Sequence, residues 1–510
     1  MGSRIPIPCR PATRIVLWQT GAMPMRICFV SAEYSPFAKT GGLGDVAAAL
    51  TRHLARRSHD LRVFVPLHGQ MELASIDRHP VDFLADLPLR VGPHEFRYSV
   101  QTARVPDTGL WIYLVDCPAL FDRPHIYSDS PDEHVRYLAL TRAAFECCQR
   151  MAFAPDIVHS NDWHTAFAPL LLRQAYGWDK DIFGATRSVF TIHNIGYQGV
   201  FSAGRAGDVG PGVAIEALHQ ADLGTGRINP MRHGVMYADA VTTVSPTYAA
   251  EICTPEGGHG LDGDLRRRGD AVVGILNGVD YDEWNPATDQ YLPHRYDDSD
   301  LTGKLLNKQA LLDLLRKPSA PGTPLVGMIS RLTRQKGIDL LFDTLPELLG
   351  GARDLRFVAL GSGEPHYERF MHSLQERFPG RATYYSGYSE ELAHLIEAAA
   401  DIFLMPSLYE PCGLNQMYSL KYGTVPIVRR TGGLADSVQP FDPATGQGTG
   451  IVFNDFDAAA VRWAVNTALE WQSRPSVWRR LVLNGMRQDF SWDAQGAAYE
   501  RLYESLTRSA

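Results

Sequence analysis

Short apolar runs rich in β-branched residues alternate with helical stretches along almost the whole chain. Near-continuous apolar strands separated by helices predict parallel sheets that are covered on both faces. Six runs in each half therefore predict two doubly wound α/β domains. The predicted strands of the first half are 26–30, 62–66, 111–116, 156–160, 188–193 and 240–245, and those of the second are 324–330, 355–361, 382–387, 401–406, 425–430 and 450–453.

The boundary between the halves is expected between Val244 and Pro324. Within that interval, the glycine- and charge-rich stretch 254–270 indicates a mobile hinge or an acceptor-side loop rather than core. Residues 1–24 contain three arginines, no acidic residue and no core pattern, so we predict an unstructured extension. Because ligands of doubly wound sheets bind at the carboxyl ends of the strands, the cleft between the domains is the expected site.

Composition places the chain among ordinary globular proteins. Its 510 residues are 45% hydrophobic and 21% charged, which excludes a disordered or low-complexity chain. The 49 basic and 57 acidic side chains give a net charge of −8, which argues against a nucleic-acid partner. The seven cysteines form no CxxC pair and indicate reduced thiols in a cytoplasmic protein. No apolar run approaches the roughly 18 residues of a membrane span.

A glycine-rich turn follows the first predicted strand. Gly41, Gly42 and Gly44 would let the backbone approach a ligand closely. Asp45 opens a helix whose amino terminus could bind an anion beside Lys39. A tight turn with a solvent-exposed lysine is the alternative. The stretch lacks the GxGxxG spacing of a dinucleotide-binding fold, and it is not a Walker loop.

Polar residues crowd the ends of the fourth and fifth predicted strands. Histidine and aspartate are common zinc ligands, but these residues come from separate loops without ligand spacing, and the sequence has no HExxH motif. A pocket for sugar hydroxyls is the more natural interpretation, with Trp163 or Tyr197 packing on the apolar faces of the sugar. The residues in question are His159, Asn161, Asp162, His164, His193 and Asn194.

The second half offers cations and glycine turns. Arg331 and Lys336 follow its first strand, where two cations at a helix start would suit a pyrophosphate; two exposed loop cations are the alternative. Glu410 lies before a glycine turn at a strand end and could hold sugar hydroxyls. Cys412 has no evident paired base, so we expect no thiolate nucleophile. These features suit an activated sugar, with a nucleoside diphosphate on the second domain and the sugar and acceptor between the two.

Several long sequence blocks between about Met25 and about Tyr503 stand out, among them KTGGLGDV (39–46), DWH (162–164), FTIHN (190–194), SRLTRQKGIDL (330–340) and EPCGLNQMYSLKYGTVPIVRRTGGLADSV (410–438). Together they resemble bacterial glycogen synthases and plant starch synthases, which form glycosyltransferase family 5. The resemblance implies the GT-B fold and transfer of glucose from ADP-glucose to the non-reducing end of an α-1,4-glucan, either glycogen or a maltooligosaccharide. It also implies retention of the anomeric configuration and no metal or other cofactor.

The resemblance further implies a domain organisation and site residues. The first domain would comprise 25–253 with 490–510, because the final helix crosses back to it, and the second would comprise 271–489, with the hinge or acceptor-side loop at 254–270 between them. On the first domain, Lys39, Gly42, Asp45 and Asn229 would line the donor site, Asp162 and His193 would face the transferred glucose, and Tyr127 would lie on the acceptor side. On the second domain, Arg331 and Lys336 would neutralise the diphosphate, Gly387 and Tyr388 would contact the nucleotide, and Glu410, Cys412, Gly413, Leu414 and Asn415 would hold the glucose and phosphates.

The chain departs from the family pattern at one position and from the wider retaining-transferase pattern at another. Arg232 stands where the family usually carries lysine, in the block that contains Asn229. Position 418 is tyrosine, as is usual for this family, so the second glutamate of the wider retaining-transferase pattern is not assumed.

Three other classes of protein remain alternatives. A non-catalytic glucan-binding homologue is disfavoured because the matched charged positions are intact. Another GT-B enzyme, such as an epimerase or a transferase using ADP-glucose or UDP-glucose with a small acceptor, is disfavoured by the KTGGLGDV and EPCGLNQ blocks together. A nicotinamide oxidoreductase is disfavoured by the missing glycine fingerprint.

Overall fold

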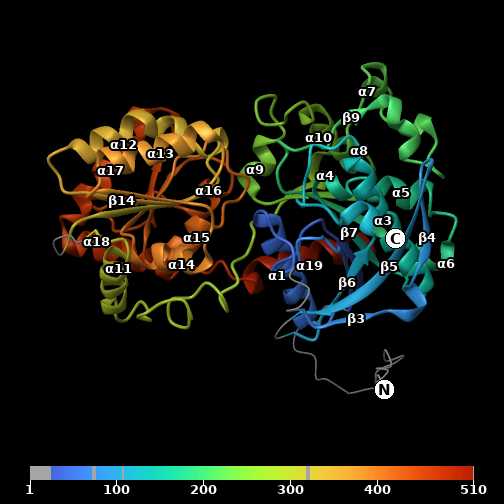
Figure 1. Cartoon of the computed structure of the whole chain (residues 1–510), viewed down its shortest axis with the longest axis horizontal. Coiled ribbons are helices and arrows are strands. Elements are labelled where there is room, and N and C mark those ends of the chain that lie inside the picture. The colour runs from blue at the N-terminus through green and yellow to red at the C-terminus, as the bar shows by residue number, and fades with distance from the viewer. Residues whose placement is uncertain (1–23, 72–75, 106–107, 318–321, 509–510) are drawn as a thin grey trace.

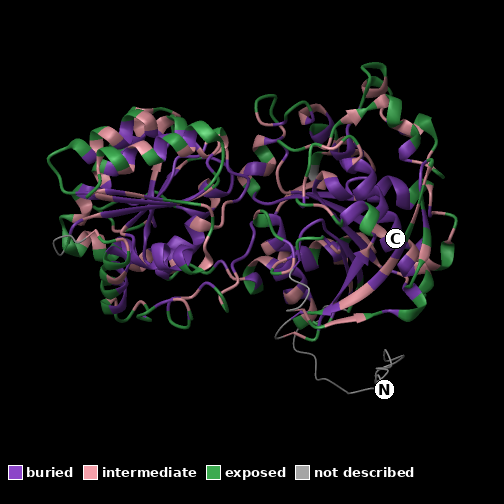
Figure 2. Cartoon of the chain, viewed as in Figure 1, coloured by how far each residue is buried: buried purple, intermediate pink, exposed green. Residues whose placement is uncertain are grey.

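The computed structural model describes residues 24–71, 76–105, 108–317 and 322–508. The extension predicted at 1–24 therefore lies, except for Pro24, outside the described residues. Two α/β domains lie side by side along the long axis of the molecule (Figure 1). The central parallel strands of both sheets are mostly buried, and exposed residues lie mainly on loops and on the outer faces of the covering helices (Figure 2).

The first sheet has ten strands, in the order β12-β11-β8-β7-β1-β2-β6-β5-β3, with β4 paired to β5. Every pair from β12 to β6 is parallel, whereas β3, β4 and β6 pair with β5 in antiparallel fashion. The parallel strands are β1 (Arg26–Val30), β2 (Asp60–Pro66), β6 (Trp111–Asp116), β7 (Ile157–Asn161), β8 (Arg187–Ile192), β11 (Ala240–Thr243) and β12 (Val272–Gly274). The antiparallel edge consists of β3 (Arg78–Pro80), β4 (Leu87–Val91) and β5 (His94–Arg104), and a separate ribbon pairs β9 (Phe201–Ser202) with β10 (Arg227–Ile228).

The second sheet has six parallel strands in the order β15-β14-β13-β16-β17-β18. They are β13 (Leu325–Ile329), β14 (Arg356–Gly361), β15 (Ala382–Ser386), β16 (Ile402–Met405), β17 (Val425–Arg429) and β18 (Ile451–Phe453). Numbered along the chain, this is the order 3-2-1-4-5-6 of a doubly wound sheet. The parallel strands of the first sheet follow the same order, with β12 added at the end. The order reverses between β1 and β7 and between β13 and β16, and ligands of such sheets bind outside these points.

Helices cover both faces of each sheet. Around the first sheet lie α1 (Gly42–Arg56), α2 (Pro118–Phe121), α3 (Glu133–Arg150), α4 (Asp162–Thr165), α5 (Ala168–Gln174), α6 (Lys180–Phe183), α7 (Gln220–Gly224), α8 (Pro230–Tyr237), α9 (Pro246–Glu251), α10 (Asp262–Arg268) and α19 (Trp492–Arg508). Around the second lie α11 (Thr302–Leu314), α12 (Leu341–Gly350), α13 (Pro365–Arg377), α14 (Glu390–Ala399), α15 (Asn415–Lys421), α16 (Gly432–Ser437), α17 (Ala458–Gln472) and α18 (Pro475–Met486). No helix in the described part of the chain combines the length and the apolar character that a membrane crossing needs.

The carboxyl-terminal helix α19 returns to the first domain and packs beside α1 (Figure 1). Tyr499 and Tyr503 of α19 are completely buried in the same apolar cluster as Leu50 and Leu54 of α1. The Tyr503 hydroxyl also lies 2.6 Å from Nδ1 of His159 under the sheet. His159, which the sequence pattern placed among the candidate ligand groups, therefore anchors α19 instead.

The stretch 254–270 differs from its sequence-based description as a mobile segment outside the core. It contains α10, and Leu261 and Leu265 have no exposed surface. The Arg268 guanidinium donates to the Ala238 carbonyl at 2.6 Å, which ties the helix to the end of α8. The chain then continues into β12, which pairs in parallel with β11, so the first sheet extends to Gly274. Residues 272–274 therefore belong to the first sheet, whereas the sequence-based boundary places them in the second domain.

Candidate active site

A hollow of about 1770 Å³ lies between the two domains. On one side, its walls are the segments that follow β1, β7 and β8; on the other side, they follow β13, β14, β15 and β16. The hollow therefore opens at the carboxyl ends of both parallel sheets, where the strand order of each reverses.

The hollow brings together all the site residues that the family resemblance implies except Asn229. From the first domain it is lined by Lys39, Gly42, Asp45, Tyr127, Asp162 and His193, and from the second by Arg331, Lys336, Gly387, Tyr388, Glu410, Cys412, Gly413, Leu414 and Asn415.

Asn229 is buried beneath the wall rather than in it. Its side-chain oxygen accepts the Arg232 N–H at 3.1 Å and caps α8, while its amide donates to Gln198 Oε1 at 2.6 Å. Gln198 does line the hollow. Asn229 is thus not among the described residues that line the hollow, and it contacts the wall through Gln198.

Asp162 begins α4 directly after β7, with a left-handed backbone (φ 54°) that is unusual for a residue other than glycine. Its Oδ1 accepts the backbone N–H groups of His193 at 2.7 Å and Asn194 at 3.2 Å, which joins the loops after β7 and β8. Burial raises the pKa of Asp162 to about 7, although these two hydrogen bonds act in the opposite direction. The carboxyl group is therefore poised to titrate near neutral pH.

His193 is held in one orientation by Asn161. The Asn161 amide donates to the Val30 carbonyl at 3.1 Å, so Oδ1 is the atom that faces His193 Nε2 at 2.9 Å. This network assigns the proton of the imidazole to Nε2. Burial lowers the pKa of His193 to about 3, which keeps the ring neutral. Nδ1 is then a hydrogen-bond acceptor, suited to a hydroxyl donor in the hollow.

Lys336 and Glu410 form an ion pair in the wall of the second domain. Lys336 Nζ lies 2.6 Å from Glu410 Oε2, which also accepts the Ser407 hydroxyl at 3.0 Å. Lys336 is the last residue of a 3₁₀ turn. It does not lie at the start of a helix, because α12 begins only at Leu341. Between them, Gly337 (φ 71°) passes so close to the Pro406 carbonyl that a Cβ atom would lie 2.0 Å from its oxygen. The turn is therefore pressed against the end of β16, which carries Lys336 to Glu410.

The glycine loop of the first domain is organised by Glu33, which sequence reasoning missed. The Glu33 carboxylate accepts the Thr40 N–H and hydroxyl, both at 2.7 Å, the Gly41 N–H at 3.2 Å, and the Tyr127 hydroxyl. Lys39 pairs with Asp45 across the loop at 2.9 Å. A signal did exist, because Glu33 is a charged residue directly after the first buried strand.

Two other reactive groups can be placed. Cys412 is buried, and burial raises the pKa of its thiol to about 12, so it is not a thiolate at neutral pH. Among the described residues, only Glu283, Glu390 and His394 form a group of three whose potential metal-ligating atoms lie close together. Of these, His394 is engaged with Asp289 at 2.7 Å.

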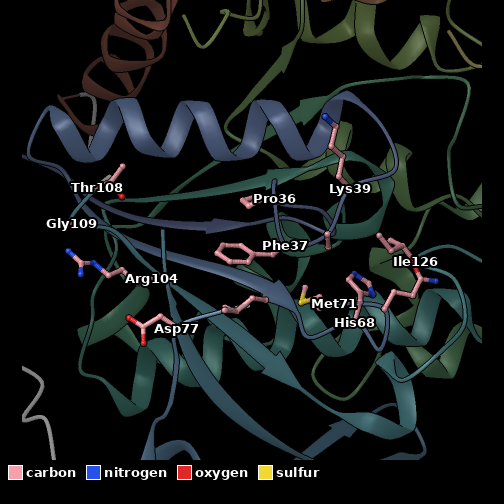
Figure 3. A pocket seen from close by; sticks show the side chains of 13 residues that line it. Pro36, Phe37, Lys39, His68, Met71, Asp77, Arg104, Thr108, Gly109 and Ile126 are labelled. Atoms are coloured by element: carbon pink, nitrogen blue, oxygen red, sulfur yellow. The ribbon is translucent and has the colours of Figure 1, made fainter. Parts of the chain in front are cut away.

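A second hollow of about 1080 Å³ lies on the first domain beside α1 (Figure 3). Phe37, His68, Met71 and Arg104 are among its lining residues. Of the predicted site residues, only Lys39 is among the described residues that line it. The interdomain hollow is therefore the candidate active site.

Comparison with known proteins agrees with this arrangement. Residues 26–267 match the starch synthase catalytic domain family, and residues 315–480 match the family of glycosyl transferases group 1. A glycogen synthase of Anaeromyxobacter sp. (strain Fw109-5) is 46% identical over 490 residues, which cover 94% of this chain and 99% of the relative. A glycogen synthase of Myxococcus xanthus (strain DK1622) is 43% identical over 487 residues, again 94% of this chain and 99% of the relative.

Solved structures show the same architecture. The catalytic domain of starch synthase IV from Arabidopsis thaliana, bound to ADP and acarbose, superposes with a TM-score of 0.87 at 35% identity, covering 95% of this chain and all of that domain. A sucrose-phosphate synthase from Thermosynechococcus elongatus shares the fold alone, with a TM-score of 0.61 at 18% identity. The chain belongs to the family of glycogen and starch synthases, glycosyltransferases with the GT-B fold.

Proposed function

We propose that this glucosyltransferase moves glucose from ADP-glucose to the non-reducing end of an α-1,4-glucan, either glycogen or a maltooligosaccharide, with retention of configuration. The observation that carries the proposal is the pairing of two kinds of wall across one cleft: cations on the second domain, and Asp162 with His193 on the first. The similar starch synthase IV domain binds ADP and acarbose, which supports an adenine nucleotide and a glucan-like ligand.

The leaving nucleoside diphosphate gains negative charge as the bond to glucose breaks. Arg331 and Lys336 line the cleft beside the carboxyl end of β13, where cations held in place stabilise that charge. The ion pair with Glu410 fixes the Lys336 ammonium before the donor arrives. Glu410 in turn holds a sugar hydroxyl, so one salt bridge sets the distance between the phosphate and glucose subsites.

The glucosyl carbon becomes positively charged in the transition state, and no protein nucleophile is needed. The bond between the anomeric carbon and the phosphate oxygen breaks while the acceptor hydroxyl attacks from the same face. The departing phosphate oxygen takes the proton of that hydroxyl. His193 Nδ1 accepts a hydrogen bond from a glucose hydroxyl. Ionised Asp162, which is held by the backbone N–H groups of His193 and Asn194, stabilises the positive charge on the sugar.

A cytoplasmic place of action is part of the same proposal. The six cysteines in the described part of the chain are all free, as expected of reduced thiols.

Radiolabelled glucose transfer to glycogen tests the proposal, with ADP-glucose and UDP-glucose compared side by side. We expect incorporation with a higher kcat/KM for ADP-glucose, and release of the label by an α-1,4-specific glucosidase. A higher kcat/KM for UDP-glucose would overturn the donor assignment. Absence of transfer by a folded preparation that binds ADP would overturn the catalytic proposal.

A further inference from the structure

A buried imidazole lies just behind the wall of the cleft that carries Tyr388 and Tyr418. We call this part the nucleotide end, because the family resemblance assigns Tyr388 to the nucleotide. His394, on α14, has no exposed surface and sits between two carboxylates. Its Nδ1 is 2.7 Å from Asp289 Oδ2, and its Nε2 is 3.6 Å from Glu390 Oε1, an ion-pair distance too long for a hydrogen bond. Burial alone would lower the pKa of His394, but the contacts with Asp289 and Glu390 outweigh it and raise the pKa to about 9. The ring is therefore a buried cation at neutral pH.

The face of this ring packs on Trp284, and Trp284 packs on a wall of the cleft. The His394 and Trp284 ring centres are 3.8 Å apart at 16°, and the Trp284 and Tyr418 centres are 3.9 Å apart at 2°. Trp284 is 7% exposed and Tyr418 is 8% exposed, and both line the hollow. The three rings form one stack, so the plane of Tyr418 follows that of His394. A cation over indole adds an electrostatic attraction to the packing.

The edge of the ring reaches a second wall residue through Glu390. The Tyr388 hydroxyl donates to Glu390 Oε2 at 2.5 Å, while Oε1 of the same carboxylate faces His394 Nε2. Tyr388 is 58% exposed and lines the hollow, so packing alone does not fix its orientation.

We propose that His394 is a positioning residue for the donor: through Trp284 it holds Tyr418, and through Glu390 it holds Tyr388, so that one side chain orients both aromatic walls of the nucleotide end of the cleft. The inference rests on the proposed function, since it assigns these walls to a nucleoside-diphosphate sugar. It adds an indirect role to a residue that does not touch the cleft and that sequence motifs do not single out.

The charge of His394 is the part of this arrangement that packing does not explain. An apolar ring would also stack on Trp284, but it would leave Glu390 without a cation behind it. Glu390 shares its surroundings with Glu283 and Asp45, and Lys39 is the other cation that attracts it. Because Lys39 already pairs with Asp45 at 2.9 Å, His394 is the cation that can hold Glu390 toward the second domain.

Two glutamates in the first turn of α14 provide a matched pair of variants. Glu390→Gln removes the charge that links His394 to Tyr388, whereas Glu391→Gln removes a charge from the same turn on an exposed residue. For Glu390→Gln we expect the ADP affinity measured by calorimetry to fall about 3- to 10-fold, as for loss of one net hydrogen bond. The KM for the donor should rise by the same factor, and kcat should stay within about twofold of wild type. Glu391→Gln should match wild type in all three. Wild-type ADP affinity in Glu390→Gln would overturn the proposal.

His394→Gln tests the centre of the arrangement, and the double variant His394→Gln/Glu390→Gln tests the coupling. If both act through Tyr388, the double variant should weaken ADP binding less than the product of the two single effects. A purely structural histidine predicts a lower Tm with wild-type ADP affinity in the folded fraction, and that result would overturn the proposal. Calorimetry with ADP requires no glucose transfer, so a failure here is distinguishable from a failure of the proposed activity, which the wild-type transfer assay reports.

Discussion

Replacing Lys336 by alanine breaks the one ion pair that joins the predicted phosphate and glucose subsites. The Lys336 side chain is 18% exposed and the Glu410 side chain 6%, so the variant leaves a buried carboxylate without its cation. Removing one partner of a fully buried pair costs about 3–5 kcal/mol. Because this pair lines an open cleft that admits water, we expect about 1–3 kcal/mol. At roughly 2–4 °C per kcal/mol, that lowers Tm by about 2–12 °C.

Turnover in this variant should fall for a separate reason. Loss of one preorganised charge on the leaving diphosphate should reduce kcat about 10²-fold. The double variant Lys336→Ala/Glu410→Gln separates the two effects, because it removes the orphan charge but does not restore the cation. We expect it to regain most of the lost Tm and none of the lost kcat.

Thermal melts without ligand and initial transfer rates on the same preparations measure both quantities. An unchanged Tm in Lys336→Ala would refute the reasoning, since the salt bridge would then contribute nothing to stability. A double variant as unstable as the single one would also refute it, because the cost would then arise from lost packing of the lysine stem. The sequence alone predicts an intact fold for Lys336→Ala, on the ground that a loop cation bears little packing; the contact with Glu410 changes that expectation.

Three further predictions concern the same cleft. Glu410→Gln should lose about 10- to 150-fold in activity and still bind ADP, because an amide donates where the carboxylate accepts a sugar hydroxyl; transfer rates and ADP calorimetry on one preparation measure both. Activity should survive EDTA, since Arg331 and Lys336 supply the positive charge; loss on chelation that Mg²⁺ restores would contradict this. Asp162→Asn should raise Tm at pH 8 and leave it unchanged at pH 4. The folded pKa of Asp162, about 7, exceeds the unfolded value of about 4, so wild-type stability falls as pH rises between these values.

The sequence predicts the parallel strands well and the antiparallel edge poorly. Buried parallel strands such as β1 and β13 are apolar on both faces, which makes them visible as continuous runs. In β4 and β5, buried and exposed residues alternate, and no apolar run results. In the stretch around α10, glycines and arginines dominate the sequence pattern, whereas the two residues that pack into the core, Leu261 and Leu265, form no apolar run.

The candidate site was predictable to the extent that it follows from strand order. In a doubly wound sheet, the segments after the first and fourth strands meet outside the switch point. These segments hold Glu33 with Lys39 and Asp162 in the first domain, and Arg331 with Lys336 and Glu410 in the second. Because Glu33 follows β1, the switch-point rule points to Glu33 as well as to Lys39.

Contacts between side chains are a different matter, because they depend on register. Lys336 and Glu410 are 74 residues apart and meet because β13 and β16 are hydrogen-bonded neighbours whose carboxyl ends coincide. His394 and Trp284 are brought together by the packing of α14 against the segment that carries Trp284. A motif can therefore name the residues that face a substrate, whereas the residues that orient them are found only from the packed structure. In this protein, His394 belongs to the second kind, and it acts on the cleft through an ion pair and a stacked ring.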